Sequence, residues 1–365
     1  MTRLIAPHYL WHESQLCEGM AVEISGGRIT RMRPLNDGET PDLRIHFLGP
    51  ALTDLQVNGS GGVMLNSNPT AKAIAHIVET QRSLGTGWVM PTLITCEREV
   101  MSQAADAAVD AWGVEGFLGL HIEGPHLNVE RKGTHNAACI RPIDDATLSL
   151  LALLRSSGIP VMLTLAPECV DADTIRRIAD MGVVVSAGHS AATAAETRAG
   201  LAAGISCFTH LYNSMPPMQS REPGIVGAAI NSDGFAGIIV DGHHVDWSMV
   251  ALACRARPRN GRMFMISDAM ATIDGPDHFE LYGETIYVRD GALVNAAGSL
   301  AGAHIDLAAC LANGVREVGL PLAEAYEMAA MVPRDVMQLA RPGLEAGVPV
   351  TEVIALDEQL QRQAL

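Results

Sequence analysis

The stretch GVVVSAGHSAATAAETRAGLAAGISCFTHLYN, residues 182 to 213, decides the fold. It reads as a buried strand, a helix that begins near Thr193 and ends at Gly204, and a second buried strand. A helical connection of this kind joins neighbouring parallel strands. His189 ends the first strand and His210 the second, so we expect the two imidazoles on adjacent strands at the same end of the sheet.

The same strand-then-helix unit recurs through the middle of the chain. Eight runs are typical of buried strands, namely residues 49–59, 85–95, 116–124, 159–168, 182–190, 204–213, 235–245 and 261–270. Helix-like segments join several of them, at 144–158, 171–182, 193–204 and 246–261. This alternation predicts an α/β fold, a parallel (β/α)8 TIM-like barrel, with a doubly wound open sheet as the lesser alternative.

The two ends of the chain follow a different pattern. Residues 1–48 and 343–357 read as short strands and turns. We therefore expect a small β-sandwich domain from residues 1–49 and 336–365, beside a metal-dependent catalytic barrel domain of residues 50–335. A hairpin-like segment, residues 279–295, interrupts the barrel after its eighth strand.

Composition excludes several classes of protein. The 365 residues, 48% of them hydrophobic, can bury a large core. No apolar run reaches the roughly 18 residues of a membrane helix, and the first residues lack a signal-peptide pattern. A net charge of -16 disfavours nucleic-acid and anionic-membrane partners. Seven scattered cysteines without a CxxC pair read as reduced thiols, so we expect a cytoplasmic protein.

Polar residues stand where the predicted strands end. They are Glu123 on the third strand, His189 on the fifth, His210 on the sixth, His244 after the seventh and Asp268 on the eighth. In a barrel these ends meet at one mouth, where barrel enzymes carry their chemistry. A lone strand-end histidine is usually structural, but five such residues at one mouth indicate a site. One carboxylate and two imidazoles suit a divalent metal such as zinc, with a position open for water.

Several blocks carry a resemblance to a known family. They are DLQVNGSGG (54–62), HIEGPHLNVERKGTHN (121–136), AGHS (187–190), THLYNSMPPMQSREPGIVGAA (209–229), DGHHV (241–245), SDAM (267–270) and GSLAGAHIDL (298–307). With them the chain resembles the N-acetylglucosamine-6-phosphate deacetylases of the amidohydrolase superfamily. The resemblance implies hydrolysis of N-acetyl-D-glucosamine 6-phosphate to D-glucosamine 6-phosphate and acetate.

The resemblance also implies a role for individual residues. Glu123, His189 and His210 match the metal ligands, and Asp268 matches the carboxylate that takes a proton from the attacking water and gives it to the leaving amine. His135 matches a residue that hydrogen-bonds the amide carbonyl oxygen. We expect one divalent metal per subunit, zinc first, although iron, cobalt and manganese suit the same ligands. His126 is assigned no metal role.

The first strand departs from a common amidohydrolase pattern. Many members carry a His-x-His pair there that holds a second metal, whereas this chain has Gln56-Val57-Asn58. Neutral amides are weak ligands for transition metals, so a single-metal site is predicted. Gln56 and Asn58 either contact a second ion weakly or only hydrogen-bond water, and both alternatives stay open.

Substrate phosphate requires local positive charge on this acidic chain. Arg221 offers a fork of donors suited to phosphate oxygens, with a surface salt bridge to Glu222 as the alternative. The resemblance implies a homodimer in which Arg221 reaches the neighbouring active site. It also implies that phosphate is bound by His244 and by backbone N–H groups near Asn213 and Ser214. His243 stands where the family more often has an apolar residue, and it either tunes phosphate affinity or faces solvent.

Other functions remain as alternatives. N-acetylgalactosamine 6-phosphate differs from the glucosamine substrate by one hydroxyl orientation, and no motif here reads that position. An N-acyl amino acid or cyclic amide substrate is disfavoured by Arg221 and His244. A non-catalytic sugar-phosphate-binding homologue is disfavoured because the metal, base and carbonyl-binding residues are all retained.

Overall fold

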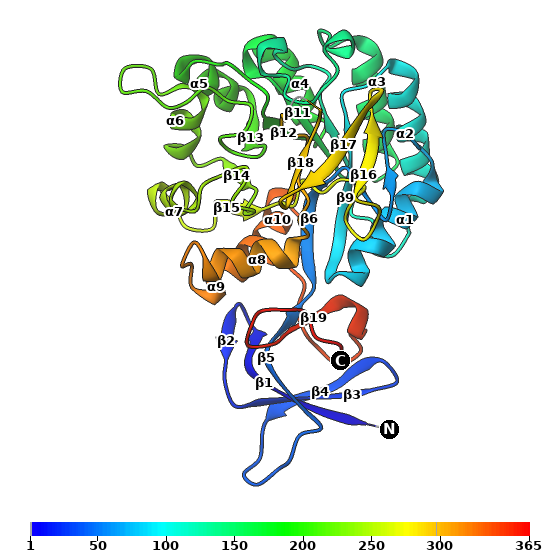
Figure 1. The fold of residues 1–365 in the computed structure, drawn as a ribbon, viewed down its shortest axis with the longest axis vertical. Helices are drawn as coiled ribbons and strands as arrows, with labels where there is room; N and C mark the ends of the chain where they lie inside the picture. The colour runs from blue at the N-terminus through cyan, green and yellow to red at the C-terminus, as the bar shows by residue number, and fades with distance from the viewer. Residues whose placement is uncertain (1, 297) are drawn as a thin grey trace.

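A computed structural model describes residues 2–296 and 298–365, and its centre is a barrel of eight parallel strands (Figure 1). The strand order is β15-β14-β13-β12-β11-β10-β9-β6. A parallel bridge between Val57 and Ala269 joins the first strand to the segment after the last. The predicted barrel is therefore confirmed. The strands are β6 (Leu52–Val57), β9 (Thr86–Ile94), β10 (Leu120–Glu123), β11 (Val161–Leu165), β12 (Val184–Ala187), β13 (Ile205–Phe208), β14 (Phe235–Ile238) and β15 (Met263–Met265).

Burial on both faces explains why these strands could be recognised. Every residue of β6, β10, β11 and β12 is buried. A parallel strand enclosed in this way has a nearly continuous apolar sequence, because helices cover its outer face and neighbouring strands fill the barrel interior. The polar residues that do occur in them therefore need partners inside the barrel.

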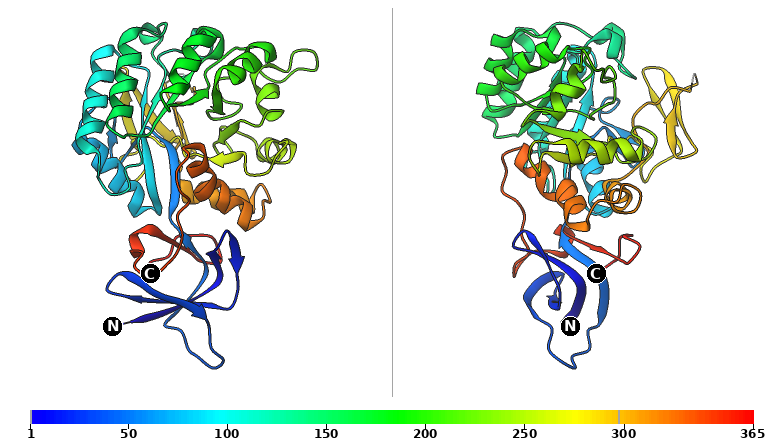
Figure 2. Two further views of the ribbon diagram at one scale, coloured as in Figure 1. Left: turned by 180° about the vertical axis from the view of Figure 1, so that it is seen from behind. Right: turned by 90° about the vertical axis from the view of Figure 1, so that its left-hand side faces the viewer.

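Helices cover the outside of the barrel (Figures 1 and 2). Thr193 caps α5 in a capping box with Glu196, and Gly204 ends it with a φ of 126°, as the sequence predicts. No helix among the described residues is long and apolar enough to cross a membrane. The helices are α1 (Ala71–Ser83), α2 (Arg98–Ala111), α3 (Asp145–Ser156), α4 (Ala172–Asp180), α5 (Ala194–Ala203), α6 (Gly224–Ile230), α7 (Trp247–Ala256), α8 (Leu307–Arg316), α9 (Leu322–Tyr326) and α10 (Val332–Val336).

Both ends of the chain contribute to a second sheet, below the barrel in Figure 1. The C-terminal strand β19 pairs antiparallel with β5, with Val353 opposite Pro50, and β5 leads directly into β6. We call this the terminal sheet; the division into domains at residues 49/50 and 335/336 stays a prediction. Its strands are β1 (Arg3–His12), β2 (Gln15–Cys17), β3 (Met20–Ser25), β4 (Arg28–Pro34), β5 (Leu43–Pro50) and β19 (Val353–Leu356).

The segment after the eighth strand forms three antiparallel strands rather than a simple hairpin. They are β16 (His278–Leu281), β17 (Glu284–Arg289) and β18 (Ala292–Val294), here called the accessory sheet. It stands out from one side of the barrel (Figure 2, right). Phe279, Leu281 and Ile286 pack in one apolar cluster with Ile94 and Met270, which fixes this sheet against the barrel. A short hairpin of β7 (Gly59–Ser60) and β8 (Val63–Met64) follows β6.

Candidate metal centre and active site

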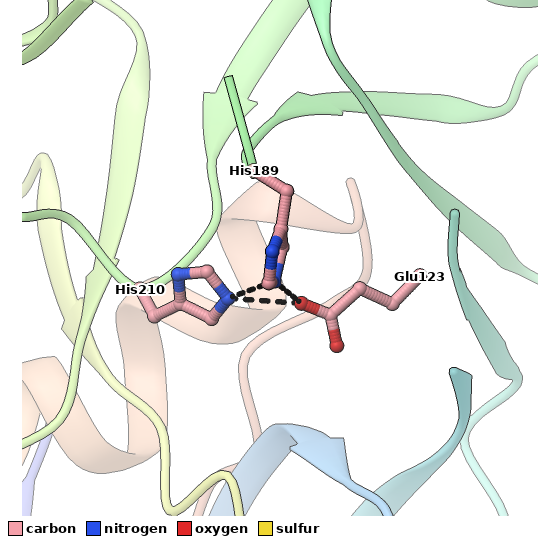
Figure 3. A group of neighbouring side chains, drawn as sticks. All are labelled: Glu123, His189 and His210. Carbon is pink, nitrogen blue, oxygen red and sulfur yellow. Dashed lines mark hydrogen bonds and ion pairs between the residues drawn. The ribbon is translucent and has the colours of Figure 1, made fainter. Parts of the chain in front are cut away.

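Three predicted ligands meet at the mouth of the barrel (Figure 3). Glu123 ends β10, and His189 and His210 each lie two residues beyond the ends of β12 and β13. Glu123 Oε1 lies 3.0 Å from His189 Nε2 and 2.9 Å from His210 Nε2, and the two nitrogens are 3.0 Å apart. All three side chains are buried. The barrel topology therefore brings together residues that are 87 positions apart along the chain.

The arrangement of donor atoms fits a divalent cation. His189 Nδ1 lies 2.8 Å from the Arg131 carbonyl oxygen, so Nδ1 carries the hydrogen and Nε2 presents a lone pair to the cluster. Burial alone raises the pKa of Glu123, but hydrogen bonds and charge interactions with His189 and His210 bring it well below its ordinary value. An ionised carboxylate and converging imidazole nitrogens are the ligand types of a divalent metal site.

The backbone at the mouth adopts a rarely populated conformation. His189, His210 and Asp268 have φ values of 48°, 29° and 52°, and Ser214 has 53°. Non-glycine residues in this left-handed region cost of order 1–3 kcal/mol each and persist only where the surrounding structure holds them. Such strain gathers at functional sites, and the sequence alone did not predict it at these positions.

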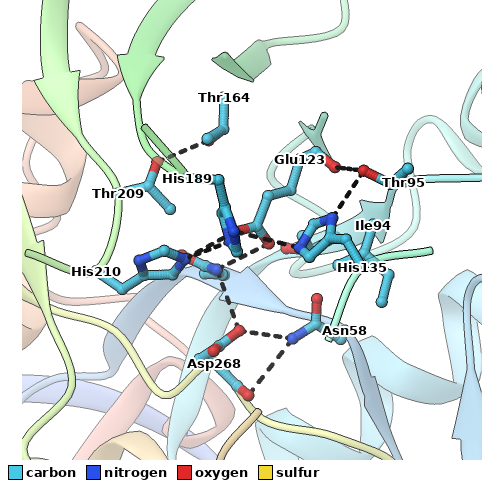
Figure 4. A network of polar contacts seen from close by, with 12 residues as sticks. Asn58, Ile94, Thr95, Glu123, His135, Thr164, His189, Thr209, His210 and Asp268 are labelled. Atoms are coloured by element: carbon cyan, nitrogen blue, oxygen red, sulfur yellow. Dashed lines mark hydrogen bonds and ion pairs between the residues drawn. The ribbon is translucent and has the colours of Figure 1, made fainter. Parts of the chain in front are cut away.

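Asp268 lies within a network of amide donors (Figure 4). Gln56 Nε2 bridges Glu123 Oε2 at 3.0 Å and Asp268 Oδ1 at 3.1 Å, and Asn58 Nδ2 donates to Asp268 Oδ1 at 2.7 Å. Both amide nitrogens therefore face carboxylates as hydrogen-bond donors. Burial first, and the charge of Glu123 second, raise the pKa of Asp268 to about 6. A carboxyl group with a pKa near neutrality can both accept and return a proton.

His135 lies against the cluster from the loop that follows β10. Its Nε2 is 4.0 Å from Glu123 Oε1, and its Nδ1 is 2.7 Å from Thr95 Oγ1. The Tyr282 hydroxyl, from the accessory sheet's first turn, donates to the Thr95 carbonyl oxygen. Sequence reasoning missed Thr95 and Tyr282. Thr95 directly follows β9, so the strand-end rule that selected Glu123 could have found it.

Most of the predicted site residues line one cavity of about 210 Å³. Asn213, Ser214 and His244 contribute to its wall beside the metal cluster, His135 and Asp268. Several wall residues were not predicted, namely Ile94, Gly133, Thr134, Met270, Leu300 and Gly302. The lining of the cavity therefore combines ionisable groups with apolar side chains.

His244 is held by an acidic neighbour that sequence reasoning also missed. Its Nδ1 lies 2.6 Å from Asp241 Oδ2, and both residues follow β14. The adjacent His243 is exposed. His126 lies apart from the metal cluster, and its Nδ1 hydrogen-bonds the Arg141 carbonyl oxygen.

Arg221 is the predicted substrate-binding residue that the structure does not bring into this cavity. It is exposed in the loop between β13 and α6. The alternative of a salt bridge to Glu222 is not seen among the described residues, since Glu222 Oε1 accepts from the backbone N–H groups of Ala194 and Gly224. That Arg221 reaches the active site of a neighbouring subunit stays a prediction.

Comparison with known proteins agrees with this architecture. Residues 47–347 match the sequence pattern of the amidohydrolase family. The N-acetylgalactosamine-6-phosphate deacetylase of Shewanella sp. (strain ANA-3) is 37% identical over 91% of this chain and 86% of its own. The N-acetylglucosamine-6-phosphate deacetylase of Haemophilus influenzae is 33% identical over 86% of this chain and 84% of its own.

A solved structure extends the likeness to the whole fold. The crystal structure of N-acetylglucosamine-6-phosphate deacetylase from Pasteurella multocida superposes with a TM-score of 0.88 at 31% identity, covering 99% of this chain and 97% of that one. The chain belongs to the amidohydrolase family, in the branch of the N-acetylhexosamine-6-phosphate deacetylases.

Proposed function

We propose that this protein hydrolyses N-acetyl-D-glucosamine 6-phosphate to D-glucosamine 6-phosphate and acetate. The observation that carries the proposal is the buried Glu123–His189–His210 cluster, which shares one cavity with Asp268 and His135. A metal-dependent amide hydrolase needs a metal site, a general base and a donor for the carbonyl oxygen, and this cavity supplies residues suited to each.

The reaction divides among the residues as follows. A divalent metal held by Glu123, His189 and His210 would acidify a water and polarise the amide carbonyl. Asp268 accepts a proton from the attacking water and returns it to the departing amine nitrogen. Gln56 and Asn58 orient the Asp268 carboxylate through their hydrogen bonds.

His135 acts on the carbonyl oxygen. Burial lowers its pKa well below the ordinary value, so the imidazole is neutral. The Thr95 hydroxyl can donate to Nδ1, which leaves Nε2–H free to donate into the cavity. A neutral donor next to the metal cluster adds no charge that would repel the cation.

The phosphate end of the substrate is assigned to the residues of this cavity that lie outside the metal cluster. His244 and the backbone N–H groups near Asn213 and Ser214 bind it within the subunit, and Arg221 completes the site from the partner in a homodimer. The exposed position of Arg221, without an ion pair among the described residues, supports a role outside its own cavity.

We propose one zinc ion per subunit, because the two imidazoles and one carboxylate match a mononuclear hydrolytic zinc site, although iron, cobalt or manganese suit the same ligands. Gln56 and Asn58 direct N–H groups at carboxylates, which supports a hydrogen-bonding role over contact with a second metal. We also propose a cytoplasmic location, supported by seven free cysteines, which suit a reducing compartment.

A second candidate substrate is N-acetylgalactosamine 6-phosphate. It is favoured by the Shewanella relative, whose 37% identity exceeds the 33% of the Haemophilus enzyme. The mechanism is the same for both epimers, so only the position that meets the C4 hydroxyl distinguishes them.

Acetate release by the purified, metal-analysed protein tests the proposal. The substrates are N-acetylglucosamine 6-phosphate, its galactosamine epimer and unphosphorylated N-acetylglucosamine. We expect the highest kcat/KM with the first and about one metal per chain. Preference for the galactosamine epimer would show that N-acetylgalactosamine 6-phosphate is the substrate and would leave the proposed mechanism unchanged. A metal-loaded protein that releases acetate from none of them would refute the proposed function.

A further inference from the structure

Asp241 uses both oxygens of its carboxylate at the edge of the cavity. Oδ1 accepts from the backbone N–H groups of His243 at 2.9 Å and His244 at 2.8 Å. Oδ2 lies 2.6 Å from His244 Nδ1. The side chains are nearly buried, with 5% of Asp241 and 8% of His244 exposed. One carboxylate thus fixes both the backbone and the imidazole ring of His244.

This contact determines which form of His244 can bind an anion. An ionised carboxylate only accepts hydrogen bonds, so Nδ1 of His244 carries a hydrogen. Burial by itself raises the pKa of Asp241, but the hydrogen bond and charge of His244 lower it below the ordinary value, which keeps Asp241 ionised. In a neutral imidazole, Nε2 would then lack a hydrogen and could not donate to phosphate. Donation from Nε2 while Nδ1 bonds Asp241 Oδ2 requires a hydrogen on both ring nitrogens, which is the imidazolium form.

The charge of the cavity makes such a cation useful. Glu123 and Asp268 line the same wall as His244, and the whole chain carries a net charge of -16. A phosphate dianion that enters needs a compensating positive charge. No described residue hydrogen-bonds His244 Nε2, so this nitrogen is available to a ligand in the cavity.

We propose that Asp241 is a positioning residue that holds His244 as an imidazolium with Nε2–H directed at the 6-phosphate, and so sets the preference for phosphorylated over unphosphorylated substrate. The inference rests on the proposed function. It adds a specificity role for a residue that touches neither the substrate nor the metal.

A purely structural role for Asp241 is the competing explanation. An Asp side chain that accepts from backbone N–H groups two and three residues later stabilises a turn. Stabilisation of a turn explains the hydrogen bonds accepted by Asp241 Oδ1, but it does not explain the contact between Oδ2 and His244 Nδ1. Asp241→Asn keeps an oxygen for the turn and removes the negative charge. Its amide N–H would donate to Nδ1, which leaves His244 neutral with a weaker Nε2–H donor.

The test compares kcat and KM for N-acetylglucosamine 6-phosphate and unphosphorylated N-acetylglucosamine. For Asp241→Asn we expect KM to rise about tenfold for the phosphorylated substrate only, with kcat and the melting temperature near wild type. Asp246→Asn is the matched control, because Asp246 caps α7 through the N–H of Ser248 without a histidine partner. It should leave the ratio of the two KM values unchanged.

Two further measurements keep the test decisive. His244→Asn should give a similar rise in KM, and the double variant should add little to it, because the two residues act as one unit. Calorimetric titration with glucosamine 6-phosphate and with glucosamine replaces KM if unphosphorylated turnover is too slow. Equal changes for both ligands, or no change in Asp241→Asn, would overturn the role of Asp241. A wild-type protein without preference for phosphate would instead refute the proposed function.

Discussion

At the barrel mouth, carboxylates and imidazoles are buried, whereas in the terminal sheet charged side chains stay on the surface over an apolar core. Glu123 and Asp268 are buried, and Asp268 has a left-handed φ of 52°, whereas Arg33 bonds Glu23 at 2.8 Å and Glu39 at 2.6 Å in a partly exposed cluster. In this cluster of the terminal sheet, the guanidinium is paired with carboxylates of the chain itself. The mouth gathers lone pairs and charges that a cation and a substrate would satisfy. Substitutions should therefore reduce activity at the mouth and stability in the terminal sheet.

Loss of the metal should give the largest effect. Glu123→Gln removes the negative ligand, so we expect metal content and acetate release to fall to background, while the protein still folds. Elemental analysis and acetate release measure both. His243→Asn, an exposed neighbour of the site, is the control and should keep metal and turnover. Full activity in a metal-free Glu123→Gln protein would contradict the metal site.

Asp268→Asn should separate chemistry from binding. We expect turnover to fall about 10²–10⁴-fold, because the proton acceptor is lost, while metal content and KM stay near wild type. The exposed carboxylate of Asp277, which bonds His278, provides the control Asp277→Asn. Near wild-type turnover in Asp268→Asn would show that another group is the base.

A core substitution in the terminal sheet should have the opposite profile. Leu48 is fully buried in its apolar cluster, so Leu48→Ala should lower the free energy of unfolding by about 2–5 kcal/mol. Turnover at 25 °C should stay near wild type. Urea denaturation measures the change, and Leu153→Ala, on a side chain that is 46% exposed, is the control. An activity loss in Leu48→Ala as large as that of Asp268→Asn would contradict the expectation that substitutions in the terminal sheet affect stability and not activity.

The pH dependence of the unfolding free energy also distinguishes the two regions, through one carboxylate in the barrel and one in the terminal sheet. Burial raises the pKa of Asp54, on β6, from 3.8 to about 7, with hydrogen bonds from Ser267 acting against the shift. The folded state therefore favours protonated Asp54, and its contribution is present below about pH 4 and lost as the pH rises to about 7. Asp54→Asn should make the unfolding free energy depend less on pH across that window. An unchanged pH dependence would show that Asp54 does not titrate there.

Glu39 should give the smallest effect, with the opposite sign. Hydrogen bonds from Arg33 and Asn36 lower its pKa from 4.5 to about 2. Its contribution is present above about pH 4.5 and is lost as the pH falls toward 2. Glu39→Gln should change stability only slightly, and 1 M salt should reduce the difference because the pair lies at the surface and is partly exposed. A large, salt-independent loss at pH 7 would contradict this assignment.

Much of the fold was predictable because its signals are local. Eight apolar runs gave the strands, since parallel strands buried on both faces need continuous apolar sequence. Thr193 and Gly204 marked a helix because capping depends on residues within one turn. The third strand of the accessory sheet was missed because residues 279–295 were read as one hairpin. Its signal was local, since Asp290-Gly291 forms a two-residue turn between β17 and Ala292–Val294.

The sequence by itself determined the barrel, the strands and turns at both chain ends and the types of residue at the strand ends, because burial pattern and turn chemistry depend on neighbouring residues. Tertiary structure alone decided that Thr95 contacts His135, that Asp241 fixes His244, and that Gln56 bridges two carboxylates. It also decided the left-handed backbone of His189 and His210. These features depend on distances of a few ångström between residues that the chain brings together only when the barrel closes.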